Sequence, residues 1–186
     1  MANPSMAQQI KELQKKLKQY SDKEVPRAAR SAINKIAAKA KTEIVRTVGT
    51  EVKVKSSILK KQVFVSRAKG DGIRAYIKSY LRPILAARLI TDSVLQKSMG
   101  KGTNKRGVKV SGRQFDGAFI NRGSRDGRIY VLQRKGAGRY PLRKISIKID
   151  VAMQLHQLPI AKRFTEEQFQ KELIRELQFR ISKYAQ

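Results

Sequence analysis

The sequence lacks several of the residues on which catalytic and covalent chemistry depends. It has no cysteine and no tryptophan among its 186 residues, and a single histidine, His156. Without cysteine, disulfides and thiolate metal ligands are excluded. One histidine without a visible partner set does not indicate a Ser-His-Asp arrangement. Because His156 lies beside Leu155 and Leu158, we interpret it as a packed or surface histidine.

Long apolar runs are also missing. No stretch reaches the roughly 18 apolar residues that a membrane-spanning helix needs, so no span is predicted. Residues 1–9 contain no basic segment followed by an apolar one, and we expect no signal peptide. Aromatic residues make up only 6% of the chain and hydrophobic residues 40%. These values predict a modest core, with much of the chain at surfaces or in interfaces.

Acidic residues are scarce and scattered, and no phosphate-binding loop is visible. Asp116 and Asp126 are the pair to consider as metal-binding nuclease acids, but they fall in separate predicted loops. The glycine pairs at 70/72, 100/102 and 136/138 lack the Lys-Ser or Lys-Thr of a Walker motif and the third glycine of a dinucleotide fingerprint, so they predict turns. We therefore expect no enzymatic activity, no cofactor and no metal site.

Positive charge is what the chain has in excess. Forty-two lysines and arginines oppose fourteen acids, for a net charge of +28. A compact domain with this charge repels itself unless something anionic lies beside it. Nucleic acid, an anionic membrane surface and an acidic protein are the partner classes that fit. Solubility alone is usually served by a far smaller charge.

The charge is concentrated in one region. Residues 97–148 hold fifteen cations and two acids, whereas residues 149–186 hold six and five. Few aromatic residues separate the cations, so the expected contact is with phosphates and without base readout. Acidic neighbours in a protein assembly are the alternative, and the two are not exclusive. The cations predicted to face DNA are Lys101, Lys105, Arg106, Lys109, Arg113, Arg122, Arg125 and Arg128.

Helical periodicity dominates both ends of the chain. Residues 6–20 predict an amphipathic helix, and Ser21 with Glu24 predicts a capping box for a second helix that ends near Gly49. Near the C-terminus, Pro159 predicts a break, and Thr165 with Gln168 a second capping box. The apolar positions predicted to lie in the core or between subunits are Ala29, Ile33, Ile36, Ala40, Ile44, Phe169, Leu173, Leu177 and Ile181.

The middle of the chain predicts short strands. They are expected at residues 63–68, 73–79, 108–110, 115–121, 128–134 and 145–149, and residues 98–106 predict a mobile basic loop. The fold class is α+β, with N-terminal helices and a C-terminal helix packed on a small, mostly antiparallel β-sheet with a long basic loop. Residues 1–22 are expected to form a helical arm and residues 23–186 the α+β domain.

Several segments, taken together and in order, resemble the minor tail protein Z family of long-tailed phages, whose members are also called tail-completion proteins. Gly117-Ala118-Phe119-Ile120 followed by Gly138-Arg139-Tyr140-Pro141-Leu142 after a basic strand is the most specific combination. The other similar segments are Val25–Ala29, Ala32–Ala37, Val54–Lys61, Leu81–Ile84, Tyr130–Arg134 and Phe169–Ile181. The resemblance covers about residues 20–185 and includes no motif for the 98–106 loop.

The resemblance implies a non-enzymatic structural subunit of the virion tail, assembled in the host cytoplasm. Such a subunit is expected to form a ring, sixfold to match the tail tube, in the head-proximal neck and to be needed for tail completion and head-tail joining. Its implied partners are further copies of itself, the tail terminator and tube proteins, the C-terminus of the tape measure protein, and the end of the genomic double-stranded DNA. No membrane partner is expected.

Two other functions remain open from the residues alone. A free, basic nucleic-acid-binding protein of histone-like or ribosomal type would bind DNA in isolation with strong salt dependence. A nuclease would require clustered acids, which the sequence does not suggest. Assembly with tail components would separate the first of these from the structural subunit.

Overall fold

The structure is a computed structural model that describes residues 15, 18, 20–70, 72–91, 94–95, 107–124 and 126–184. Long helices and small antiparallel sheets coexist in it, which confirms the predicted α+β class. The chain divides into two compact units. The first unit lies within Met1–Glu43, Phe64–Lys78 and Leu158–Gln186, and the second comprises Ile44–Val63 and Ser79–Gln157.

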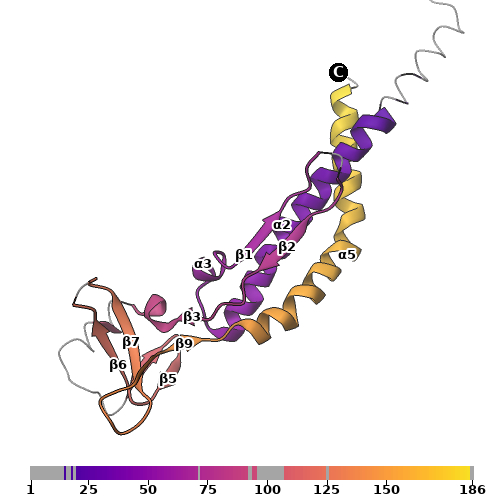
Figure 1. The fold of residues 1–186 in the computed structure, drawn as a ribbon. Coiled ribbons are helices and arrows are strands. Elements are labelled where there is room, and N and C mark those ends of the chain that lie inside the picture. The colour runs from indigo at the N-terminus through magenta and orange to yellow at the C-terminus, as the bar shows by residue number, and fades with distance from the viewer. Residues whose placement is uncertain are drawn as a thin grey trace, which may run out of the picture. The chain divides into compact units, whose positions relative to one another are not determined.

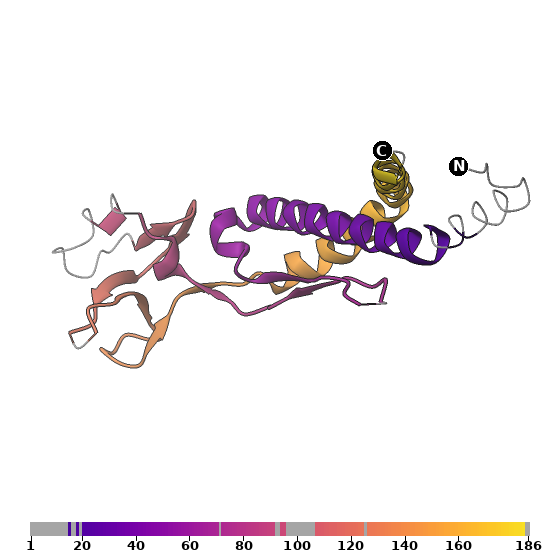
Figure 2. The same cartoon turned by 90° about the horizontal axis from the view of Figure 1, so that it is seen from above.

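The first unit is built from helices and one strand ribbon. Its helical elements are the π-turn η1 (Tyr20–Glu24), the first part of α2 (Val25–Val52) and the C-terminal part of α5 (Asp150–Tyr184). Its ribbon pairs β1 (Val63–Ser66) with β2 (Tyr76–Ser79). Figures 1 and 2 show α2 beside α5, with the ribbon running along α2.

Alanine at helical spacing lets these elements approach closely. Ala28, Ala32, Ile36 and Ala40 recur every four residues along α2, and all are buried. Residues four apart lie on one helix face, so three alanines and one isoleucine form one continuous buried stripe. The Asn34 side chain donates to the Ala68 carbonyl (3.2 Å) and accepts from the Ala68 N–H (2.8 Å). This pair of bonds fixes the end of the ribbon to α2.

The second unit holds short strands in small antiparallel sheets around the C-terminal end of α2. Within the described residues, β3 pairs with β9, β4 pairs with β5, and β6, β7 and β8 form one three-stranded sheet. The strands are β3 (Ile84–Leu85), β4 (Val108–Val110), β5 (Arg113–Phe115), β6 (Ala118–Arg122), β7 (Ile129–Arg134), β8 (Leu142–Lys144) and β9 (Ser146–Ile147). The short helices α3 (Ser56–Leu59) and η2 (Ala86–Leu89) complete the unit.

The core of the second unit is aliphatic. Fully buried side chains come from α2, from the strands and from the start of α5, among them Ile44, Val48, Ile84, Val131 and Met153. Burying a side chain of this kind stabilises the fold by about 1.5–3 kcal/mol relative to leaving it exposed. Short strands can therefore persist here, because their inward residues share one core with two helices.

The end of α2 lies beyond the predicted stop. The helix continues through Gly49 to Val52 and ends where Lys53 adopts a left-handed conformation with φ 54°. The N–H of Val54 donates to the Gly49 carbonyl (2.9 Å) and that of Lys53 to the Thr50 carbonyl (3.3 Å). These two bonds satisfy carbonyls that a helix end otherwise leaves unpaired, as in a Schellman motif.

Both predicted capping boxes are wrong. Ser21 and Glu24 lie within the π-turn that leads directly into α2, and Thr165 lies inside α5, where its hydroxyl donates to the Ala161 carbonyl (2.9 Å). The predicted break at Pro159 is also wrong, because α5 runs through it without interruption. Pro159 and Leu155 are both exposed, and the Leu155 carbonyl has no N–H donor at position 159.

Strands occur at every predicted position: β4 has the predicted bounds, β1, β2, β7 and β9 are shorter than predicted, and β3 and β8 were not predicted. Residues 115–121 divide into β5 and β6 at the turn of Asp116 and Gly117, and residues 145–149 reduce to β9. The predicted loop at 98–106 and most of the predicted helix at 6–20 lie outside the described residues. The boundary between an arm at 1–22 and a domain at 23–186 therefore stays a prediction.

Candidate functional site

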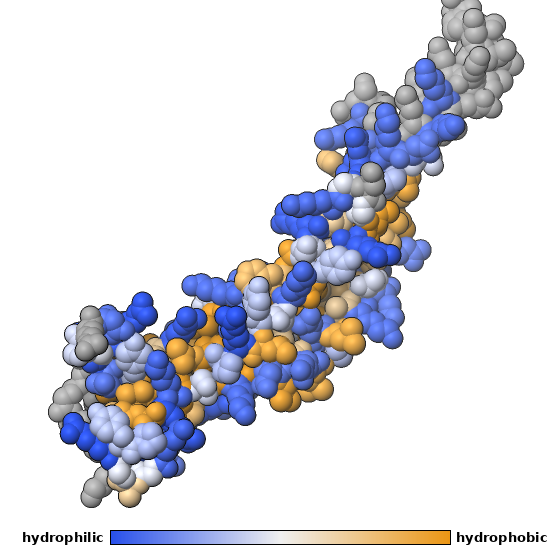
Figure 3. Space-filling model, in the orientation of Figure 1, coloured by the Kyte–Doolittle hydropathy of each residue, from blue (hydrophilic) through white to orange (hydrophobic). Residues whose placement is uncertain are grey.

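Half of the cations predicted to face DNA are placed by the structure. Lys109, Arg113, Arg122 and Arg128 are all exposed and lie in the second unit, on β4, β5, β6 and the approach to β7. The other predicted cations, Lys101, Lys105, Arg106 and Arg125, lie outside the described residues. Figure 3 shows hydrophilic side chains over much of its visible face, with smaller hydrophobic areas among them.

The β4–β5 ribbon separates two of these cations. Val108 and Val110 are buried and Lys109 between them is exposed, as alternation along a strand requires. Lys109 pairs with Gln114, whereas Arg113 pairs with Val110. Cross-strand partners share a face, so Lys109 and Arg113 project from opposite faces of the ribbon.

Arg122 and Arg128 lie together at one end of the β6–β7 hairpin. The N–H of Gly123 donates to the Arg128 carbonyl (2.8 Å), which closes the loop between them. Asp126 in this loop accepts from the Tyr130 hydroxyl (2.6 Å) and from the Arg128 N–H (3.0 Å). The hydrogen bond from Tyr130 lowers the pKa of Asp126 and raises that of Tyr130. Asp126 therefore fixes the loop, and the hairpin end presents arginines.

One face of the three-stranded sheet combines aromatic rings with cations that the sequence did not single out. The register places Phe119, Tyr130, Arg134 and Lys144 on the same face. The Arg134 guanidinium lies 5.9 Å from the Phe119 ring centre, and the Lys144 ammonium lies 5.0 Å from that of Tyr130. Both distances allow cation–π attraction. Only the strand register, and not sequence spacing, could have grouped these residues.

The predicted apolar stripes are buried to different degrees. Ala29, Ile36, Ala40 and Ile44 are buried and Ile33 is half-buried. On α5, the side chains of Phe169, Leu173 and Leu177 are half-buried, and Ile181 is 52% exposed. Contacts with further subunits are not represented in the structure, so a role of these residues between subunits stays a prediction.

Three buried glutamates lie between α2 and α5 in the first unit. Glu24 accepts from Arg27 and from Arg180, each at 2.8 Å. Glu172 pairs with Lys39 and Glu176 with Lys35. The Arg180–Glu24, Lys39–Glu172 and Lys35–Glu176 contacts, here called the helix-pair ion contacts, join residues more than 130 positions apart in the sequence. Glu172 and Glu176 are four residues apart, so they lie on the same face of a helix. This spacing is the sequence signal that could have indicated their shared role.

The pKa values of two of these acids are lowered. For Glu172 the main cause is the hydrogen bond from Lys39, helped by the charges of Lys39, Lys35 and Arg175 against the opposing effect of burial. For Glu176 burial is the largest effect and raises the pKa, but hydrogen bonds from Lys35 and Ser31 and the charges of Lys35 and Arg180 outweigh it. Both side chains are therefore held ionised at neutral pH.

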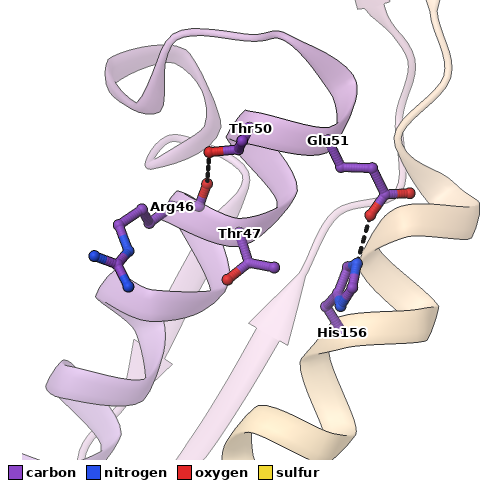
Figure 4. Close-up of a pocket in the computed structure, with 5 residues that line it drawn as sticks. All are labelled: Arg46, Thr47, Thr50, Glu51 and His156. Atoms are coloured by element: carbon purple, nitrogen blue, oxygen red, sulfur yellow. Dashed lines mark hydrogen bonds and ion pairs between the residues drawn. The ribbon is translucent and has the colours of Figure 1, made fainter.

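The single histidine lines a shallow cleft in the second unit, drawn in Figure 4. The cleft has a volume of about 570 Å³ and is lined by Arg46, Thr47, Thr50 and Glu51 of α2 and by His156 of α5. The His156 ring and the Glu51 carboxylate point toward one another and form a hydrogen bond. Among the described residues, no group of three or more His, Asp or Glu side chains could hold a metal ion.

These features define a class of protein, a basic α+β protein with exposed cations on its small sheets. Among the described helices, none is long and apolar enough to cross a bilayer. The family model for prophage minor tail protein Z (GPZ) matches residues 8–186. The chain therefore belongs to this family, as its motifs had indicated.

Two relatives of known name are similar over most of their length. The tail completion protein of Escherichia phage N15 is 30% identical over 154 residues, which cover 81% of this chain and 79% of that protein. Tail completion protein Z of Escherichia phage lambda is 28% identical over 175 residues, covering 89% and 91%. No solved structure matches the chain.

Proposed function

We propose that the chain is a non-enzymatic tail-completion subunit of a phage tail. The family match over residues 8–186 is the observation that carries this proposal. The names of the relatives from phages N15 and lambda support it.

In the finer form of the proposal, copies of the chain form a ring in the head-proximal neck, close to the channel through which DNA passes. The net charge of +28 supports a position beside an anionic polymer. The exposed arginines at the β6–β7 hairpin end and the exposed Lys109 and Arg113 suit phosphate contacts. In this arrangement residues 97–148 face the DNA, and the helical stripes pack in the core or between subunits.

The partners in this proposal are other tail components. They are further copies of the chain, the tail terminator and tube proteins, and the C-terminus of the tape measure protein. The genomic DNA end would lie against the basic region. The chain would join the particle in the host cytoplasm and remain in the virion tail.

Cryo-electron microscopy of purified tails and virions tests the proposal. A ring of this chain at the head-proximal end, with residues 97–148 toward the channel, is the expected result. Particles that lack the chain altogether would favour the alternative, a free basic nucleic-acid-binding protein. That alternative also predicts tight, salt-sensitive DNA binding by the isolated chain.

A further inference from the structure

A basic groove lies in the second unit, apart from the sheet region already described. It has a volume of about 820 Å³ and runs between the end of α3 and the segment that contains β3 and η2. Figure 1 shows α3 and β3 near one another. The N–H of Tyr80 donates to the Gln62 carbonyl (2.8 Å), and the Gln62 amide reaches the Arg82 carbonyl (3.5 Å). These bonds hold the two walls together.

The groove has an apolar lining that is open to solvent. Ile58, Pro83 and Leu85 contribute aliphatic surface, and Tyr80 contributes an aromatic ring. Tyr80 is 56% exposed and Leu85 37%. Exposed apolar side chains are ordinary when scattered, but here they converge on one concavity. A volume of this size is sufficient for a few side chains of a partner and too small for a folded domain.

The same groove is strongly cationic. Lys61, Arg82 and Arg88 line it and are all exposed, and none of the described lining residues is acidic. The Arg82 guanidinium lies 6.0 Å from the Tyr80 ring centre. Three positive charges and an exposed apolar surface in the same groove complement a ligand that carries both apolar and anionic groups.

We propose that this groove binds a short acidic segment of a partner protein, with one aliphatic side chain against Ile58 and Leu85 and flanking carboxylates against Lys61, Arg82 and Arg88. Arginine favours this role because its planar fork matches a carboxylate with two parallel hydrogen bonds. The inference goes beyond the proposed function, since it does not require the chain to lie beside DNA.

A peptide fits the groove better than a nucleic acid does. Phosphates would satisfy the three cations and a base could stack on the Tyr80 ring, but neither matches the aliphatic surface of Ile58, Pro83 and Leu85. An aliphatic side chain that enters the floor removes apolar surface from water on both partners, at about 25 cal/mol per Å². The lining therefore selects a partner that carries both charge and aliphatic surface.

Fluorescence anisotropy with the full chain tests this inference. The probe is a labelled peptide that alternates glutamate and serine around a central leucine, measured at physiological salt. The triple variant Lys61→Gln, Arg82→Gln, Arg88→Gln is expected to bind it at least about fivefold more weakly. The matched control Arg74→Gln, Lys148→Gln, Lys171→Gln removes three exposed cations outside the groove and should change binding by less than about twofold. Circular dichroism confirms that both variants are folded.

The aliphatic contact has its own control. Replacing the central leucine of the peptide by serine should weaken binding to the unaltered chain by about tenfold. Equal losses for the two triple variants, or no effect of the leucine, would show general charge attraction and overturn the proposal. Displacement of the peptide by an oligonucleotide of equal charge at the same concentration would assign the groove to nucleic acid.

Discussion

Gly107 occupies a position that no other residue fills without strain. Its φ is +72°, and a Cβ built there would lie 2.0 Å from the Phe115 carbonyl oxygen. Gly117, at the turn between β5 and β6, also has a positive φ of +65°, but a Cβ there would meet nothing within 4 Å. A side chain at Gly117 would meet only the conformational cost of a positive φ, whereas a side chain at Gly107 would also collide with the Phe115 carbonyl. Comparing the two positions therefore separates these two costs.

Replacing Gly107 by alanine should lower the free energy of unfolding by at least about 2 kcal/mol. The Gly117→Ala control should cost only about 1 kcal/mol, since it carries the conformational cost alone. Urea denaturation of both variants measures the difference. Equal losses would mean that the backbone around β4 and β5 relaxes without cost.

At Pro159 a single residue opposes the helix that contains it. It interrupts the hydrogen bonding of α5 in the helix interior, at an exposed position. Pro159→Ala restores the N–H donor to the Leu155 carbonyl, so the free energy of unfolding should rise by about 1–3 kcal/mol. Thermal denaturation should show a higher Tm for this variant than for Gln170→Ala, an exposed helical control expected to change little. A lower Tm for Pro159→Ala would indicate that the proline is needed for the geometry of α5.

At the scale of elements, the helix-pair ion contacts predict a pH dependence. The folded pKa values of Glu172 and Glu176 are lowered from 4.5. Their contribution to stability is therefore fully present above the unfolded value of about 4.5 and is lost as the pH falls through the lower folded values. The free energy of unfolding should decline on acidification below about pH 5.

A charge-neutral variant isolates this effect. Glu172→Gln should unfold more easily at pH 7, by about 1–2 kcal/mol, because it leaves Lys39 without its buried acceptor while Lys39 itself is half exposed. The same variant should lose less stability than the unaltered chain between pH 7 and pH 3. Glu166→Gln, at an exposed position, serves as control and should follow the unaltered chain. An unchanged acid profile for Glu172→Gln would contradict the assignment.

Sequence periodicity was sufficient to predict the main elements and not their ends. The α2 stripe and the short strands follow from spacing, because buried faces impose periods of about 3.6 and 2. The caps failed because Ser21 and Thr165 carry a local signal that a continuing helix overrides. Pro159 was predicted to break α5, but the helix continues through it, at the cost of one lost hydrogen bond and of the contact between the proline ring and the preceding turn.

The sequence was sufficient to predict which segment of the chain holds the candidate site. It was not sufficient to predict which side chains share a surface. Charge counts located the cations between residues 97 and 148, but only strand register shows that Lys109 and Arg113 project to opposite faces. The same register brings Arg134 and Lys144 onto the aromatic face of the three-stranded sheet. The helix-pair ion contacts were missed because their partners are distant in sequence and meet only in the fold.

At the scale of the whole molecule, the 98–106 segment allows a test in the assembled particle. Neutralising Lys101, Lys105 and Arg106 together should leave folding intact and weaken DNA retention or positioning, because these cations are predicted to contact phosphates. DNA release from particles and the position of the DNA end by electron microscopy measure the effect. Particles with normal DNA ends and normal retention would refute a DNA-facing role for these residues.

The cations that the structure does place predict the salt dependence of DNA binding by the isolated chain. Each phosphate contact contributes a slope of about −0.9 to the logarithm of the binding constant against the logarithm of salt concentration. Replacing Lys109, Arg113, Arg122 and Arg128 by glutamine should therefore reduce the slope by up to about 3–4. Lys109 and Arg113 project from opposite faces of the ribbon, so a single duplex cannot contact both in one binding mode. The reduction in the slope should therefore be nearer to about 3 than to about 4.

The matched control removes four cations from α5, where charges balance: Lys162, Lys171, Arg175 and Lys183, each replaced by glutamine. Its slope should change by less than about 1, since no phosphate contact is predicted there. If both variants lose affinity equally, the attraction comes from net charge alone and no DNA-facing surface exists on the described sheets. If neither variant loses affinity for DNA, the exposed cations of the sheet region contact an acidic protein neighbour instead. The same titration should then be repeated with tail components in place of DNA.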